Sequence, residues 1–169
     1  MTSKGESRKS DVSISYLIDG VAMPRFERKR VVQIVSAALA SADSRTTRLP
    51  HLQAVHLTVL FISDERAADL HGLHFNDATT TDVMTFPDGS CDPTGILQIG
   101  DLAVCVSVAR REALSRKRPF ADELTLYILH GFLHLLGYDD RTQRSLKAMW
   151  AEQRRLLAQV GIPLEAKPG

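Results

Sequence analysis

The segment from residue 124 to 136 constrains the fold most strongly, because it is almost wholly apolar and yet contains two histidines. An apolar run of this length, followed by a glycine, predicts a buried helix. His130 and His134 stand four residues apart, so on a helix both imidazoles lie on one face, about one turn apart. Unpaired polar groups are costly in apolar surroundings. The two rings therefore need polar partners or a metal ion.

A candidate for a third metal ligand follows the two histidines in the sequence. Gly137 allows the chain to leave the helix and turn back, and Asp140 comes ten residues after His130. Inside the same helix Gly131 costs about 1 kcal/mol relative to alanine, which indicates a close backbone approach or a space requirement beside a site. The sequence therefore predicts a metal site made of His130, His134 and Asp140.

Two other interpretations of these residues stay open. Two histidines on a buried helix can hydrogen-bond to the backbone or to each other and bind no ion. Asp140 can instead cap the helix that follows, with Gln143 three residues later as its capping-box partner, and Asp139 could cap equally well.

The ligand types limit the chemistry. Zinc proteases of the H-E-x-x-H type use the glutamate as general base, and Gly131 stands at that position, which disfavours proteolysis by this route. Two imidazoles and one carboxylate suit one divalent ion, with zinc preferred over non-haem iron and other ions. Three protein ligands leave a coordination position open, as in catalytic rather than structural zinc sites.

The same segment resembles the YbeY endoribonucleases, whose pattern is H-G-x-x-H-x-x-G-x-D-H. The chain departs from it only at the last position, where Asp140 replaces the family's third histidine. Residues 81–87, Thr-Asp-Val-Met-Thr-Phe-Pro, resemble the T-D-V-L-S-F-P block of the family, and Gly100-Asp101-Leu102 resembles its G-D-I strand entry. A second departure is Phe75, which stands where many members carry an arginine implicated in RNA cleavage.

This resemblance implies a metal-dependent, single-strand-specific endoribonuclease that acts in ribosomal RNA maturation, at the 3′ end of the small-subunit RNA. Its partners would be RNA and the ribosomal subunit or its proteins. The two departures keep a non-catalytic RNA-binding maturation factor as the first alternative, and a metal-dependent hydrolase of another substrate as the second. No general base, and hence no catalytic side chain, can be assigned from the sequence.

Charge gives only local guidance to an RNA-binding surface. The chain has 21 Lys and Arg against 20 Asp and Glu, a formal net charge of +1. Arg110, Arg111 and Arg116 form a basic cluster shortly before the metal helix, and we take them as candidate substrate contacts. Most such clusters are simply solvated helix faces.

Length and composition indicate one domain. With 169 residues and 44% hydrophobic residues the chain can bury one substantial core. We expect a domain at residues 11–162, a disordered tail at 1–10 and a flexible tail at 163–169. The start is polar, the two cysteines form no C-x-x-C pair, and no apolar run reaches the ~20 residues that span a bilayer, which favours the cytoplasm and no membrane contact.

Strand and helix patterns alternate along the chain and predict an α/β (α+β) fold with a mixed four-stranded sheet, about five helices and a metal-site helix like that of metalloproteases. The strands are expected at residues 12–18, 55–62, 81–86 and 96–107. The helices are expected at residues 24–39, 108–116, 119–136 and 141–159. A further helix is expected to be capped by Ser63 or Asp64 and to end at about His71 or His74.

Overall fold

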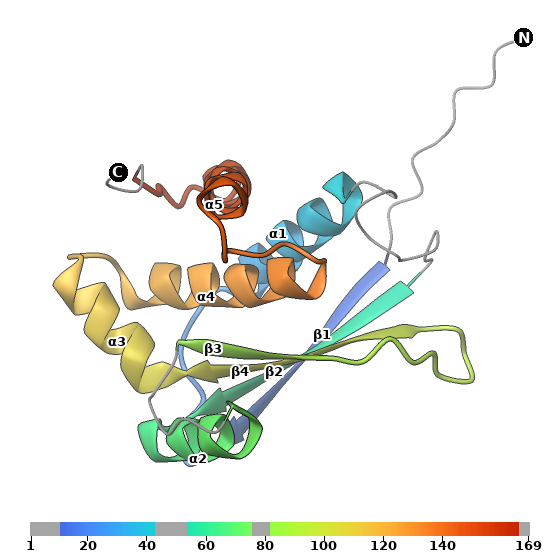
Figure 1. The fold of residues 1–169 in the computed structure, drawn as a ribbon, viewed down its shortest axis with the longest axis horizontal. Coiled ribbons are helices and arrows are strands. Elements are labelled where there is room, and N and C mark those ends of the chain that lie inside the picture. The colour runs from blue at the N-terminus through green and yellow to red at the C-terminus, as the bar shows by residue number, and fades with distance from the viewer. Residues whose placement is uncertain (1–10, 43–53, 76–81, 166–169) are drawn as a thin grey trace, which may run out of the picture.

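The computed structural model describes residues 11–42, 54–75 and 82–165, which form one four-stranded sheet with helices on both faces (Figure 1). The strands are β1 (Asp11–Asp19), β2 (Ala54–Ile62), β3 (Val83–Pro87) and β4 (Leu97–Cys105). Their order is β1-β2-β4-β3, with β1, β2 and β4 parallel and β3 antiparallel to β4. This is the mixed four-stranded sheet that the sequence predicts.

The described helices are α1 (Arg28–Ser41), α2 (Asp64–Phe75), α3 (Val106–Ser115), α4 (Phe120–Leu135) and α5 (Gln143–Ala158), which confirms the predicted α/β class. Helices α1 and α4 lie over one face of the sheet, α5 lies above them, and α2 covers part of the opposite face (Figure 1). Helix α4 is therefore enclosed between the sheet and α5, as its apolar sequence requires.

The main core lies between the sheet and the layer of α1 and α4. It includes Val59 and Phe61 of β2, Leu102 of β4, and Ile128 and Phe132 of α4, all fully buried. The chain stays packed slightly beyond the expected domain end, since Leu164 is only 6% exposed. Residues 1–10 and 166–169, which hold most of the expected tails, lie outside the described residues.

The first helix begins four residues later than predicted. Pro24 is a favourable first residue for a helix, yet α1 starts at Arg28 with Glu27 as its extended N-cap. Phe26 explains the delay, because its ring packs edge-on against Tyr16 and Phe61, with centroids 5.1 and 5.5 Å away. The segment before α1 thus stays non-helical and packs the partly buried Phe26 against the core.

Smaller shifts occur at other element ends. Strand β4 ends at Cys105 and α3 follows at once from Val106, two residues before its predicted start. Strand β3 begins at Val83, and Thr81, its predicted first residue, lies outside the described residues. None of the described helices combines the length and the apolar character needed to cross a membrane.

Candidate metal centre

Helix α4 supplies the two histidines from its last two turns. The residues around them are buried, whereas the side chains of His130 and His134 remain 23% and 25% exposed. Their rings lie edge to face with centroids 4.6 Å apart, and the two Nε2 atoms are 3.1 Å apart. The spacing of four residues therefore places both rings on one face, as predicted.

Gly131 allows this part of α4 to lie close to the sheet. A Cβ atom added at Gly131 would stand 2.9 Å from a methyl carbon of Leu102 and 2.9 Å from one of Val83. This accounts for the glycine that follows the first histidine, because a larger side chain would push the histidines away from β3 and β4.

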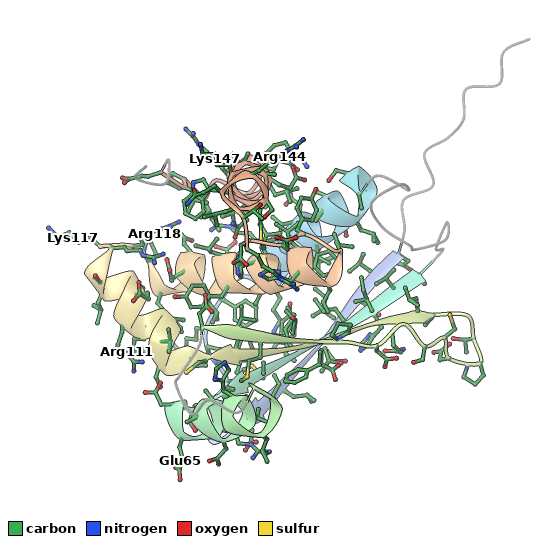
Figure 2. All side chains as sticks on the ribbon, in the orientation of Figure 1. Glu65, Arg111, Lys117, Arg118, Arg144 and Lys147 are labelled. Carbon is green, nitrogen blue, oxygen red and sulfur yellow. The ribbon has the colours of Figure 1, made fainter. Side chains whose placement is uncertain are left out.

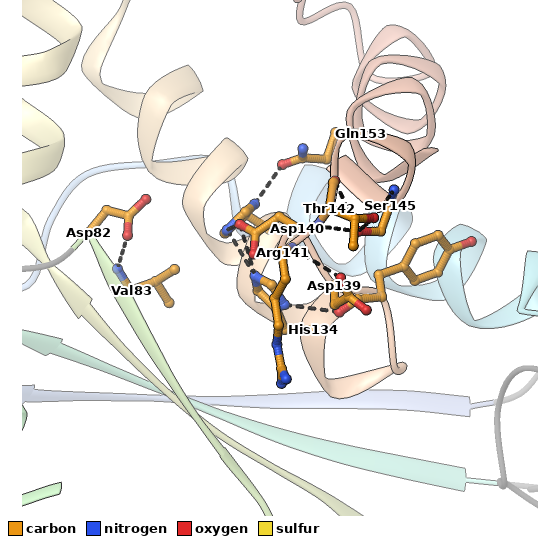
Figure 3. A network of polar contacts seen from close by, with 11 residues as sticks. Asp82, Val83, His134, Asp139, Asp140, Arg141, Thr142, Ser145 and Gln153 are labelled. Atoms are coloured by element: carbon orange, nitrogen blue, oxygen red, sulfur yellow. Dashed lines mark hydrogen bonds and ion pairs between the residues drawn. The ribbon is translucent and has the colours of Figure 1, made fainter. Parts of the chain in front are cut away.

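The turn after α4 brings Asp140 back to the histidines. Gly137 has φ +94°, a conformation that favours glycine, and the amide of Tyr138 donates to the carbonyl oxygen of Leu133 at 3.0 Å. Asp140 follows this turn, and its Oδ2 atom lies 3.9 Å from Nε2 of His130 and 3.8 Å from Nε2 of His134 (Figure 3). One ligand atom from each residue fits within 4.8 Å of the others, which makes these residues a candidate metal site.

Helix α5 is capped by Thr142 and Ser145, and not by Asp140 or Asp139. Thr142 is the N-cap, since its hydroxyl accepts from the amide of Ser145 while the Ser145 hydroxyl accepts from the amide of Thr142, both at 3.1 Å. Asp139 accepts from the amide of Arg141 at 3.1 Å instead. The alternative in which Asp140 or Asp139 caps α5 with Gln143 is therefore wrong, and the Asp140 side chain faces the histidines instead.

Both rings are held through their other nitrogen atom. Nδ1 of His134 lies 3.0 Å from the carbonyl oxygen of Tyr138, and Nδ1 of His130 lies 3.1 Å from Oε1 of Gln153 on α5. Burial, followed by the neighbouring His134, lowers the pKa of His130. The fold therefore favours neutral His130, the form that binds a metal ion.

The spacing of the donor atoms can be compared with that around zinc. Tetrahedral zinc with bonds of about 2.0–2.2 Å would place its ligand atoms about 3.3–3.6 Å apart. The observed separations of 3.1, 3.8 and 3.9 Å differ from this by a few tenths of an ångström. The three candidate ligand atoms of His130, His134 and Asp140 therefore lie close to the spacing that one zinc ion requires.

The three candidate substrate arginines lie away from the three candidate metal ligands. Arg110 stacks over the ring of Phe120 at 4.6 Å, and Arg116 pairs with Glu123 at 2.9 Å, so both contact the first turn of α4. Arg111 is 2.8 Å from Asp64 on α2. Because a helix rises 1.5 Å per residue, Phe120 and His130 are about 15 Å apart along α4. Figure 2 shows Arg111 on α3, toward the beginning of α4.

Two acidic residues beyond the three candidate ligands have different surroundings. Glu123 is fully buried at the start of α4 and pairs with Arg116 and Arg118, which accounts for it without a role beside His130. Asp82 stands just before β3, and its carboxylate accepts from the amide of Val83 at 2.8 Å. In Figure 3 this carboxylate is directed toward α4, the helix that carries His134.

Sequence reasoning missed Gln153. Its position carried a signal, because a glutamine lies on the same face of α5 as the apolar residues Met149 and Leu156, which are 1% and 0% exposed. Its partner on α4 could be identified only once the two helices were placed together.

The chain has an α/β fold in which two histidines and an aspartate gather at the end of a core helix. These features define a class of candidate metalloproteins, and comparisons with known proteins identify the family within that class. The family model described as Endoribonuclease YbeY matches residues 22–161. Endoribonuclease YbeY of Bordetella avium is 37% identical over 142 residues, covering 84% of this chain and 86% of its own length. That of Idiomarina loihiensis is 36% identical over 154 residues, covering 90% of each chain.

The chain therefore belongs to the YbeY family, as its motifs indicate. A solved structure agrees at the level of the fold. The solution structure of TM1509 from Thermotoga maritima superposes with a TM-score of 0.51 and 22% identity, covering 93% of this chain and 99% of that one.

Proposed function

We propose that this protein is a metal-dependent endoribonuclease that cuts single-stranded RNA, with His130, His134 and Asp140 as the ligands of one divalent ion. The observation that carries the proposal is the convergence of three ligand atoms within 4.8 Å, in a chain of the YbeY family. Zinc is the preferred ion, because two imidazoles and a carboxylate are an established zinc set.

The bound ion would supply positive charge and Lewis acidity beside a phosphodiester. The residues of the chain provide the ligands and their orientation: two imidazoles held through their Nδ1 atoms, and a carboxylate placed by the turn at Gly137. The partly exposed side chains leave the donor atoms accessible from solvent, as a substrate would require.

We further propose that the RNA is ribosomal, that the cut matures the 3′ end of the small-subunit RNA, and that the protein works in the cytoplasm on the subunit or its precursor. This part is supported by family membership. Arg110, Arg111 and Arg116 remain candidate contacts to a longer RNA, reached only if the strand extends along α4 from the histidines toward α3.

The test is cleavage of a labelled RNA that carries the precursor 3′ sequence, offered single-stranded and annealed into a duplex, by the zinc-loaded protein. We expect cuts in the single strand only, and none with His134→Ala. His56→Ala is the matched control, because His56 lies on β2 and bonds to Ser13 at 2.8 Å. Cleavage that survives His134→Ala would overturn the proposal.

One observation favours a second function, that of a non-catalytic RNA-binding maturation factor. Asp140 replaces the third histidine of the family pattern, and a carboxylate cancels one unit of the ion's charge, which weakens it as a Lewis acid. A zinc-loaded protein that binds the single strand without cutting it would identify a non-catalytic maturation factor. Cleavage of another substrate would identify a different hydrolase.

A further inference from the structure

The His130 ring is held by a side chain from a different helix. Oε1 of Gln153 on α5 lies 3.1 Å from Nδ1 of His130, and Gln153 is only 3% exposed (Figure 3). An amide buried among core residues is costly unless it is hydrogen-bonded. Among the described residues, the hydrogen bond with His130 is the one that satisfies the buried Gln153 amide.

The two histidines are oriented by different means. Nδ1 of His134 faces the main-chain carbonyl oxygen of Tyr138, which can only accept, so His134 carries its proton on Nδ1 and presents a lone pair on Nε2. The corresponding partner of His130 is a side chain. Only at His130, therefore, can a substitution remove the orienting group while leaving all three ligands in place.

We propose that Gln153 is a positioning residue of the metal centre: its Oε1 atom accepts the Nδ1–H of His130 and thereby directs the Nε2 lone pair toward the ion. This inference rests on the metal site of the proposed function. Outer partners of this kind fix the tautomer and ring orientation of a ligating histidine, and their loss usually lowers metal affinity 10- to 100-fold.

The amide group gives the centre a specific electrostatic property. Gln153 is neutral, so it orients His130 without adding a second negative charge to that of Asp140. A carboxylate in the same place would accept the same hydrogen bond more strongly and make the ring a better donor to the ion. Gln153→Glu should therefore keep or raise the metal affinity, whereas a side chain without an acceptor should lower it.

The experiment compares the full-length protein with Gln153→Met, which has similar volume and no amide. Zinc affinity is measured by competition with a chromophoric chelator, and the ligand geometry by the visible absorption of the cobalt-loaded protein. We expect zinc affinity to fall about 10- to 100-fold in Gln153→Met, with a changed cobalt spectrum. Gln153→Glu should restore the affinity to the parent level or above.

A neighbouring substitution separates positioning from general loosening of α5. Leu156→Ala removes a fully buried side chain of α5 without touching the three ligands, so it should lower thermal stability and leave zinc affinity and the cobalt spectrum unchanged. The proposal is wrong if Gln153→Met keeps the parent affinity and spectrum, or if Leu156→Ala weakens zinc binding equally.

These results remain distinguishable from failure of the proposed function. A parent that binds zinc but does not cut RNA would refute the endoribonuclease activity, while the zinc and cobalt measurements would still decide the role of Gln153. A parent that binds neither zinc nor cobalt would refute both.

Discussion

Asp140 is the residue whose chemistry distinguishes this chain from the YbeY pattern. Its carboxylate faces the two Nε2 atoms at 3.8 and 3.9 Å, while the capping that it could have provided is carried out by Thr142 and Ser145. A ligand change from imidazole to carboxylate alters the charge of the centre by one unit without altering the number of ligands.

Substitutions at Asp140 test this assignment. Asp140→Asn should weaken zinc binding, because an amide replaces the charged ligand, and should change stability little, because Asp140 caps no helix. Asp140→His should still bind zinc, with an affinity that falls more steeply below about pH 6.5, since three imidazoles rather than two must then lose a proton. Zinc titrations between pH 5.5 and 8 measure both effects, and unchanged binding in Asp140→Asn would exclude Asp140 as a ligand.

At the scale of elements, the contact of α4 with the sheet depends on two glycines. Gly131 faces Leu102 and Val83, and Gly100 on β4 lies under Leu135 and against the backbone of β3. The two sites differ in what surrounds them: side-chain methyl groups at Gly131, but backbone atoms at Gly100.

We therefore expect Gly100→Ala to be the more damaging substitution. Its Cβ would stand 2.5 Å from the carbonyl oxygen of Phe86, at a φ of +147° that side chains rarely adopt. A loss of about 2 kcal/mol or more of unfolding free energy is expected. Gly131→Ala should cost less, because the clash with methyl groups is partly offset by about 1 kcal/mol of helix propensity. Denaturant unfolding of both variants measures the two losses of unfolding free energy. A larger loss in Gly131→Ala than in Gly100→Ala would contradict the prediction.

The beginning of α5 gives a second test at this scale. Thr142→Ala removes the N-cap and should lower the unfolding free energy by about 1 kcal/mol, whereas Thr142→Ser should keep the cap. Zinc affinity should stay close to that of the parent in both variants, in contrast to Asp140→Asn. A large loss of zinc binding in Thr142→Ala alone would mean that the cap also fixes the position of Asp140.

At the scale of the whole molecule, the candidate centre joins three segments: the end of α4, the turn that follows it, and α5 through Gln153. Since an unfolded chain does not hold these groups together, zinc should stabilise the fold. At a free zinc concentration 100 times the dissociation constant, the gain is about 2.7 kcal/mol. Thermal unfolding with zinc and with a chelator measures it, and His134→Ala should remove most of the difference.

Acid should destabilise the metal-free protein through His130. Its pKa is lowered by burial and then by His134, so the unfolded chain takes up a proton at a higher pH than the folded chain. This contribution to stability is present above about pH 6.5, the ordinary histidine pKa, and is lost as the pH falls through the folded value. Denaturant unfolding between pH 5 and 8 should show the loss, and His130→Gln should flatten it.

Several features of the fold followed from sequence patterns. The apolar periodicity of residues 55–62 and 119–136 predicted β2 and α4, and the alternation of strands and helices predicted the α/β class. Element ends were less certain because distant contacts decide them. Phe26 delays α1 by packing against Tyr16 and Phe61, and no local pattern reveals such a contact.

The sequence by itself determined the membership in the YbeY family and the spacing of His130, His134 and Asp140, because motif order and helical period are properties of the chain alone. Only the tertiary structure decided that Thr142, not Asp140, caps α5 and that Gln153 contacts His130. It also decided that Arg110 and Arg116 contact the first turn of α4, and that Arg111 pairs with Asp64 on α2. These outcomes depend on how separate helices pack, since a hydrogen bond or ion pair between distant residues exists only where the fold brings their atoms together.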